Sequence, residues 1–319
     1  MTQQLPPLCL RLLKRQSGVI AAWQSESVGL DRRRAEVLIR HGRWQRLYYG
    51  VYASFTGKPP RDAVLWAAVL RAGPESILSH ETAAEVDGLL DKPSKLLHVT
   101  IPQSQRLRPI AGFAIHRSTR ALEGRGPWLL PPRTMIEETV LDLAQEAVTF
   151  DDVISLLARA CQRRLTFPVL LEQRVEMRGR MRWRAEILHA LQDVADGVES
   201  PLEYRYLRDV ERAHSLPAGK RQAHAMQGGR GVRRDVFYRE YGVVVELDGK
   251  LSHAERRVQD NRRDNAATAC GLVTLRYGWA DVAERACATA AEVGTTLGGR
   301  GWPGPLGTCR HCGPRRSVI

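Results

Sequence analysis

"VVVELDGKLSH", residues 243–253, joins an apolar run to two carboxylates, a glycine and a histidine. An almost continuous apolar run of this length is typical of a central strand that is covered on both faces. Because side chains alternate along a strand, Val244, Glu246 and Asp248 are expected on one face. An unpaired buried carboxylate costs several kcal/mol, and two on one face also repel each other. We therefore expect a positive partner for this pair, either a metal ion or an arginine or lysine.

A third carboxylate is expected beside this pair. Residues 232–238 have the pattern of a strand, and a hairpin turn at 241–242 would place Asp235 beside Glu246. Carboxylate oxygens are the ligands that Mg²⁺ and Mn²⁺ prefer. Such an ion can hold a phosphate, activate a water molecule and stabilise a leaving oxygen. The sequence therefore predicts that these carboxylates hold Mg²⁺ or Mn²⁺.

A histidine and two aspartates follow the acidic strand. His253 lies five residues after Asp248, where an imidazole can act as a general base or protonate a leaving group. A helix-start histidine with no catalytic role is an equal reading. In the helix expected over 255–269, Asp260 and Asp264 lie one turn apart on one face. A salt-bridged, exposed face explains these two aspartates at least as well as catalysis does.

The strand belongs to a last domain that is expected over residues 197–296. Its elements, in chain order, are a helix at 201–214, strands at 219–226, 232–238 and 242–248, a helix at 255–269, a strand at 271–277 and a helix at 279–294. Ser200, Pro201 and Glu203 have the pattern of a capping box at the start of the first helix. That structural role is sufficient to explain Glu203.

Residues 297–319 are rich in glycine and proline and are expected to form a flexible tail. Within this segment, Cys309 and Cys312 have the spacing of half a zinc site. The sequence shows no second cysteine pair, because Cys270 and Cys287 fall in or near expected core elements. A loose tail is therefore favoured over a metal site.

Residues 1–58 have the plan of a winged helix-turn-helix domain, three helices followed by a β-hairpin. The third helix is expected to have Asp31 as its N-cap and to stop at Gly42, and the aromatic stretch around Gly50 predicts two strands and a turn. A recognition helix contacts DNA near its start. The predicted DNA-binding residues are therefore Arg32, Arg33, Arg34, Arg43 and Arg46. A solvated charged face on a protein-interaction domain is the alternative.

The middle region, residues 59–196, mixes expected helices and strands and contains no catalytic spacing. Ser79 is expected to cap a helix. His98 and His116 lie on expected strands, where a structural role is the simpler reading than a role as ligands. This region is therefore predicted to be an α+β domain.

The overall composition favours a polyanionic partner. The 319 residues carry a formal net charge of +13 and the pI is about 9.9, which favours nucleic acid first and an anionic membrane second. The sequence has no signal peptide and no stretch of roughly 18 apolar residues. Its six cysteines are scattered, which suits a reducing compartment. The expectation is a cytoplasmic protein with no membrane partner.

One ordered set of residues in the last domain carries a resemblance: Asp235, Glu246-x-Asp248-Gly249, His253, the Arg-Arg-Asp at 262–264, Gly271 and Arg276-x-x-Trp279. Over about 199–285 the chain resembles the endonuclease-like domain of unknown function related to the very-short-patch mismatch repair endonuclease. Both belong to the PD-(D/E)xK superfamily. The resemblance implies a restriction-endonuclease-like α/β fold with a mixed central sheet.

The same resemblance implies roles for individual residues. It makes Asp235 a metal ligand and adds the backbone carbonyl of Leu247 to the metal. His253 and Asp264 match the family's catalytic histidine and helix aspartate, and Glu203 matches its helix glutamate.

Two positions depart from the superfamily pattern. Asp248 stands where the Glu-x-Lys motif has lysine, and Arg234 precedes Asp235 in place of proline. Asp248 together with Glu246 is expected to replace the lysine by additional metal ligation. These departures put activity in doubt but not the fold.

Roughly the first 180 residues resemble the antitoxin of abortive-infection type IV toxin–antitoxin systems. The stretches that carry this resemblance are "GRWQRLYYGVYA" (42–53) and "LSHETAAEVDGLL" (78–90). Antitoxins of this class bind promoter DNA through a winged helix. The resemblance therefore implies double-stranded DNA as a partner of this half.

The sequence as a whole predicts a multidomain α+β protein. Its expected parts are a winged helix-turn-helix domain (1–58), an antitoxin-like α+β domain (59–196), an endonuclease-like domain (197–296) and a tail (297–319). The predicted function is Mg²⁺-dependent hydrolysis of phosphodiester bonds in double-stranded DNA, with no organic cofactor. The alternatives are a non-catalytic, antitoxin-like transcriptional regulator and a protein-interaction module. A homodimer is among the arrangements that the sequence leaves open.

Overall fold

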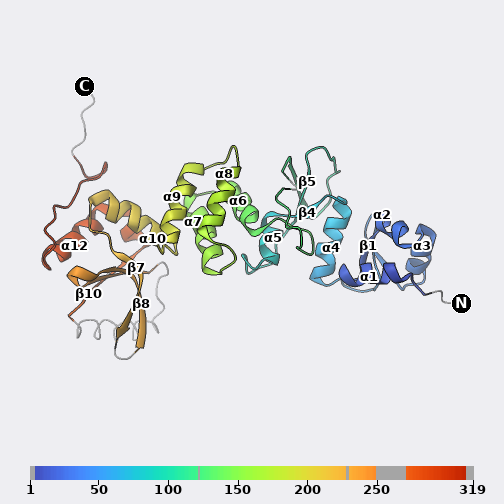
Figure 1. Cartoon of the computed structure of the whole chain (residues 1–319), viewed down its shortest axis with the longest axis horizontal. Coiled ribbons are helices and arrows are strands. Elements are labelled where there is room, and N and C mark those ends of the chain that lie inside the picture. Colours follow the sequence, from blue (N-terminus) through green and yellow to red (C-terminus); the bar gives the residue numbers. More distant parts are fainter. Residues whose placement is uncertain (1–3, 121–122, 228–229, 249–270, 314–319) are drawn as a thin grey trace, which may run out of the picture. The chain divides into compact units, whose positions relative to one another are not determined.

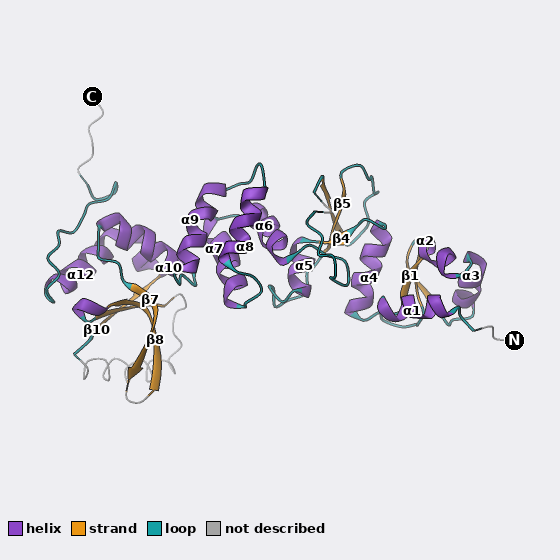
Figure 2. Cartoon of the chain, in the orientation of Figure 1, coloured by secondary structure: helices purple, strands orange, loops and turns teal. Residues whose placement is uncertain are grey.

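The computed structural model describes residues 4–120, 123–227, 230–248 and 271–313 (Figure 1). The chain forms two compact units, Met1–Glu146 and Ala147–Ile319. Each unit combines helices with a sheet that contains parallel and antiparallel pairs (Figure 2), so the predicted α+β class is confirmed. The expected boundaries after residues 58 and 196 fall inside these units. No helix in the described part of the chain is long and apolar enough to cross a bilayer.

The first unit begins with helices and strands in the order helix–strand–helix–helix–strand–strand. These elements are α1 (Pro7–Arg15), β1 (Val19–Ala21), α2 (Ala22–Ser25) with a 3-10 turn at Glu26–Val28, α3 (Arg32–Arg40), β2 (Gln45–Tyr48) and β3 (Val51–Ala53). β3 lies between β1 and β2 and is antiparallel to both. The expected N-cap is confirmed, because the Asp31 carboxylate accepts the backbone N–H of Arg34 at 2.8 Å. The second of the three expected helices was predicted over residues 18–30; the structure has helical turns only at residues 22–28 and a strand, β1, before them.

The three-stranded sheet is covered on both faces. Ile20 and Tyr52 face one side, where they pack with Leu13 and Trp44 in a cluster that also includes residues of α1 and α3. Val19, Ala21 and Val51 face the other side and pack against α4 (Arg61–Ala72). Alternation along short strands therefore places α4 against the sheet and joins it to the preceding residues in one unit.

A second sheet completes the first unit. Its elements are β4 (Ile77–Leu78), α5 (His80–Val86), β5 (Leu97–Pro102), β6 (Phe113–Ser118) and, after the sheet, α6 (Ile136–Glu146). β5 is central, antiparallel to β4 and parallel to β6. The apolar residues of β5 are fully or nearly fully buried against α4.

The second unit places four helices before a four-stranded sheet. Its elements are α7 (Phe150–Gln162), α8 (Pro168–Met177), α9 (Arg184–Ala195), α10 (Pro201–Arg205) with its continuation through Tyr206–Glu211 and Arg212–His214, β7 (Lys220–Gln227), β8 (Arg230–Tyr238), a 3-10 turn at Arg239–Tyr241, β9 (Val243–Asp248), β10 (Val273–Gly278) and, after a turn at Ala280–Glu284, α12 (Ala286–Gly298). The strand order is β10-β9-β8-β7, and only the β9–β10 pair among them is parallel. The helix expected over 255–269 lies outside the described residues.

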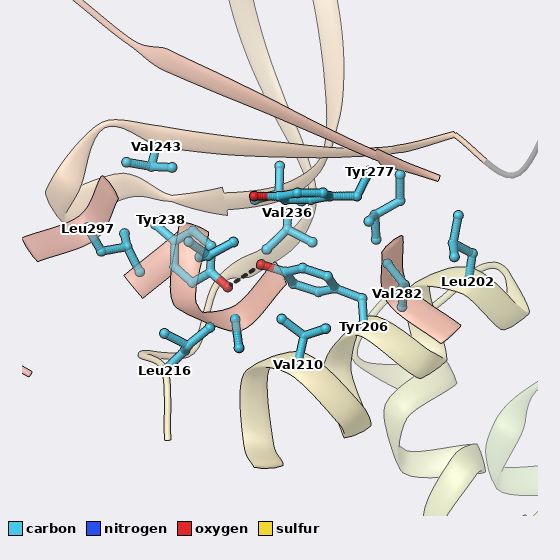
Figure 3. Close-up of a cluster of buried hydrophobic side chains, with 14 residues drawn as sticks. Leu202, Tyr206, Val210, Leu216, Val236, Tyr238, Val243, Tyr277, Val282 and Leu297 are labelled. Atoms are coloured by element: carbon cyan, nitrogen blue, oxygen red, sulfur yellow. Dashed lines mark hydrogen bonds between the residues drawn. The ribbon is translucent and has the colours of Figure 1, made fainter. Parts of the chain in front are cut away.

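One face of β9 closes the core of this unit. Val243, Val245 and Leu247 pack with side chains of the α10 segment and of α12, and Figure 3 shows Tyr206 and Tyr238 at the centre of this cluster. The two tyrosine hydroxyls lie 3.0 Å apart. The opposite face of β9 therefore carries Val244, Glu246 and Asp248, as the alternation in the sequence predicts.

Candidate functional site

Glu246 and Asp248 share the face of β9 that points away from the α10–α12 core. In the parallel pair with β10, Glu246 lies opposite Arg276 and Asp248 lies opposite Gly278. On the other side, the expected hairpin is confirmed, since Val236 of β8 lies opposite Val245 of β9.

Asp235 is the next residue along β8. Its Oδ2 accepts the backbone N–H of Leu247 at 2.7 Å. The structure therefore places Asp235 beside the acidic end of β9.

The electrostatics of these carboxylates show that they share one environment. Burial first, and then repulsion from Asp235, raise the pKa of Glu246 to about 7. Burial also raises the pKa of Asp235, and the negative charge of Asp248 adds to this rise. Near neutral pH the cluster therefore favours a bound proton or a bound cation.

Arginines supply part of the positive charge. Arg276 Nη1 lies 3.5 Å from Asp248 Oδ2, and the two side chains are 30% and 58% exposed. Arg276 also opposes the rise in the pKa of Glu246 and of Asp235. The pKa of Glu246 nevertheless stays near 7, so the arginines do not offset the burial of this carboxylate.

Glu203 adds a fourth carboxylate from α10. The expected N-cap is confirmed, because the Ser200 hydroxyl accepts the backbone N–H of Glu203 at 3.2 Å and donates to Glu203 Oε1 at 2.9 Å. The other half of the expected capping box differs: Glu203 Oε2 accepts the backbone N–H of Glu199 at 3.0 Å in place of that of Ser200. Gln222 Nε2 donates to Glu203 Oε2 at 2.8 Å. Burial raises the pKa of Glu203 to about 7, and the charge of Asp235 contributes to the rise. Glu203 therefore takes part in hydrogen bonds at the start of its helix, and its pKa also depends on the charge of Asp235.

Several predicted site residues cannot be placed in the acidic site or do not form a compact ligand group. His253, Asp260 and Asp264 lie outside the described residues. The carboxylates of Asp235 and Glu246 do not belong to either of the two groups of described His, Cys, Asp or Glu side chains whose ligand atoms all lie within 4.8 Å of one another. Among the described residues, the acidic site therefore places several carboxylates near one another, but their ligand atoms do not form a group within 4.8 Å.

One of those two groups consists of histidines in the first unit. His80 begins α5, His98 lies on β5 and His116 lies on β6. His98 Nδ1 lies 3.1 Å from His116 Nε2, and the rings of His80 and His116 stack with centroids 3.6 Å apart. Glu146 Oε1 of α6 lies 3.5 Å from His80 Nε2. Burial lowers the pKa of His116 to about 4 and also lowers the pKa of His98, which favours the neutral form of these two imidazoles, the form that binds a metal.

The other group consists of His214, Cys287, Cys309 and Cys312 in the second unit. The sequence shows only the Cys309–Cys312 half of it. Cys287 and His214 supply the missing half from elements that are 22 and 95 residues away from Cys309 along the chain. The group could not be read from spacing, because it depends on how the segment after α12 packs.

The predicted DNA-binding arginines surround α3. Arg32 and Arg33 are exposed at its start, and Arg43 and Arg46 are exposed beyond its end. Arg32 forms an ion pair with Glu36 at 3.3 Å on the same helix. Arg34 differs from the others: it is half-buried, and its Nη2 donates to the backbone carbonyl of residue 4 at 2.8 Å.

Comparison of the chain with known proteins identifies no functional residue. A scan against family models finds none that matches the chain, and a search of the curated proteins finds no match. The resemblances of residues 199–285 and of the first half of the chain therefore stay predictions.

Proposed function

We propose that the chain is a DNA-binding protein whose second unit hydrolyses phosphodiester bonds in DNA with a divalent metal ion. One observation carries this proposal. The Glu246 carboxylate is half-buried beside Asp235, and its pKa is raised to about 7 although Arg276 is close. A site that costs this much to ionise suits a cation that the protein binds from solution.

The residues present fit Mg²⁺ or Mn²⁺. The side-chain donors at the site are carboxylate oxygens, which hard cations prefer over nitrogen or sulfur. Asp235, Glu246 and Asp248 would hold the ion, with the Leu247 carbonyl as the resemblance implies. When bound, the ion supplies positive charge for a phosphate and lowers the pKa of a water molecule.

Other residues would act on the substrate directly. Arg276, beside Asp248 at the end of β10, can balance the charge of a phosphate. His253 is assigned the transfer of a proton to the leaving oxygen or from the attacking water, on the resemblance alone. Glu203 is assigned a supporting role through its charge at Asp235.

The topology of the second unit supports the proposal. A helix, three antiparallel strands and a fourth strand parallel to the third, in the order β10-β9-β8-β7, agree with a restriction-endonuclease-like core. In such mixed sheets, catalytic residues gather where strands end, and Asp248 is the last residue of β9.

The topology of the first residues supports DNA binding. The order helix–strand–helix–helix–strand–strand with β3 in the centre agrees with a winged helix-turn-helix. In this assignment α3 is the recognition helix and the β2–β3 hairpin is the wing. Arg33, Arg43 and Arg46 are exposed around them and are assigned to phosphate contacts.

A second candidate function is a non-catalytic, antitoxin-like regulator. The observation that favours it is Asp248, an acid where the superfamily motif has lysine. In this case the second unit would be a nuclease fold that has lost catalysis. Promoter binding would then persist without a metal ion and without Asp235.

Titration with Mn²⁺ tests whether the acidic site binds a metal. We expect Asp235→Asn to weaken Mn²⁺ binding about a hundredfold, because it removes a charged ligand. Because the pKa of Glu246 is raised to about 7, its carboxylate is mostly protonated about one unit below that value and ionised about one unit above it. Mn²⁺ affinity should therefore rise roughly tenfold between about pH 6 and about pH 8.

The matched control is Asp196→Asn, which changes an exposed aspartate of the same unit. It should leave both the affinity and its pH dependence unchanged. Equal Mn²⁺ affinity in the wild type and in Asp235→Asn would show that the ion, if bound, lies elsewhere.

A further inference from the structure

We infer that His214, Cys287, Cys309 and Cys312 form a closed zinc site that fastens the segment after α12 to the second unit. His214 ends the 3-10 turn Arg212–His214, and Cys287 is the second residue of α12. Cys309 and Cys312 come from the segment that follows that helix. None of these residues belongs to the acidic site, so the zinc site does not depend on the proposed function.

The spacing of the ligand atoms matches a tetrahedral zinc centre. The Sγ atoms of Cys287 and Cys309 lie 3.5 Å apart, and those of Cys309 and Cys312 lie 3.6 Å apart. Cys312 Sγ lies 3.5 Å from His214 Nε2. A tetrahedron with Zn–S of about 2.3 Å and Zn–N of about 2.0–2.1 Å separates its ligand atoms by roughly 3.5–3.8 Å.

The donor set selects zinc among common ions. Three thiolates and one imidazole are a known ligand set of structural zinc, whereas Mg²⁺ and Ca²⁺ require oxygen ligands. A disulfide explains the cluster less well. Cys309 Sγ lies near two other sulfur atoms, and a disulfide would use one of them at about 2.0 Å and leave the other unpaired.

The groups behind the ligands orient them for metal binding. His214 is 1% exposed, and its Nδ1 lies 3.1 Å from the backbone carbonyl of Val210. Nδ1 therefore carries the proton and donates it, which leaves the lone pair of Nε2 directed at the thiols. The backbone N–H of His311 donates to Cys309 Sγ at 3.3 Å, and that of Cys309 donates to Cys312 Sγ at 3.4 Å. Such N–H donors favour the thiolate form.

The segment approaches His214 closely enough to build the site. The backbone N–H of Gly307 donates to the His214 carbonyl at 2.7 Å. A Cβ at Gly307 would lie 2.7 Å from Ser215 Oγ and 3.1 Å from the His214 carbonyl carbon, so a larger residue cannot take this path without a shift. Trp302, further back in the segment, packs against the core of the unit.

The expected role of the ion is structural. All four positions of the tetrahedron are filled by protein side chains, whereas a catalytic zinc keeps one position for water or substrate. The ligands join residue 214 to residue 312. They therefore connect the turn that precedes β7 to the segment that follows α12. Zinc binding should therefore stabilise the folded second unit, because a closed site of this kind is absent from the unfolded chain.

The experiment uses the full chain purified under reducing conditions without a chelator. Elemental analysis and native mass spectrometry should find one zinc per chain. Replacement by Co²⁺ should give the intense visible bands of tetrahedral cobalt and a thiolate-to-cobalt absorption in the near ultraviolet. Cys312→Ser should weaken metal binding at least tenfold, whereas Cys312→His, which keeps a zinc ligand, should retain one metal ion per chain.

Cys161→Ser is the matched control, because Cys161 is a free cysteine of α7 in the same unit and lies outside the four-residue group. It should leave the metal content and the cobalt spectrum unchanged. Three results would overturn the inference: a folded wild type that takes up neither zinc nor cobalt, a cobalt spectrum without thiolate absorption, or an unchanged spectrum in Cys312→Ser.

Discussion

Replacing Glu211 by alanine is expected to destabilise the second unit by about 3–5 kcal/mol. Glu211 Oε1 lies 2.6 Å from Arg221 Nη2, and the two side chains are 4% and 5% exposed. Tyr238, one of the two central tyrosines in Figure 3, donates its hydroxyl to Glu211 Oε2 at 2.8 Å. Alanine would leave the Arg221 guanidinium buried without this countercharge and remove the charged acceptor of the Tyr238 hydroxyl.

Hydrogen exchange in β8 and β9 measures this loss in the full chain, because exchange reports each unit separately. Protection of these strands should fall at least about a hundredfold, which corresponds to about 3 kcal/mol. Glu240→Ala removes an exposed glutamate from the same unit and should change stability by less than about 0.5 kcal/mol. The double change Glu211→Gln with Arg221→Met should recover part of the loss. A cost below about 1 kcal/mol for Glu211→Ala would mean that the pair adds little.

The triple change Arg33→Ala, Arg43→Ala and Arg46→Ala is expected to weaken binding to duplex DNA on the order of a hundredfold at about 0.15 M salt. Each lost phosphate contact removes roughly one released counterion. The slope of log affinity against log salt concentration should therefore become shallower by about 2–3. Arg34 is left in place because it donates to the backbone carbonyl of residue 4, so its loss would mix folding with binding.

A matched triple change tests whether location matters or only charge. Lys95→Ala, Arg106→Ala and Arg108→Ala remove the same charge from exposed positions of the first unit outside the α3–wing region. This variant should keep most of its affinity and its salt slope. Equal weakening by both variants would indicate diffuse attraction, and no duplex binding by the wild type even at low salt would favour a protein-interaction module.

The acidic strand could be predicted from sequence because its information is local. The valines of 243–245 fix a strand, and alternation then assigns Glu246 and Asp248 to one face. The turn before Val243 sets the hairpin that brings Asp235 alongside. β1 was missed for the opposite reason: Val19–Ala21 is too short to show a period, and its strand conformation depends on pairing with β3.

The two clusters of potential metal ligands depend on contacts that spacing does not reveal. His98 and His116 meet because β5 and β6 are parallel with Thr100 opposite His116, a register that no local pattern indicates. Cys287 lies beside Cys309 because the segment after α12 runs back to the start of that helix. The sequence favours a structural role for His98 and His116 and a loose tail around Cys309 and Cys312. The groups that these residues form with their partners come from tertiary structure.

The measurement that tests the nuclease assignment most directly is cleavage of supercoiled plasmid by the purified chain. The account predicts nicking with Mg²⁺ or Mn²⁺, none with a chelator, none with Asp235→Ala, and full activity with Asp196→Ala. Loss of activity in a folded Asp235→Ala that still binds duplex DNA would tie hydrolysis to the acidic end of β9. If a folded, metal-bound wild type leaves the plasmid intact with either ion, or if Asp235→Ala cleaves as fast as the wild type, the nuclease assignment is contradicted.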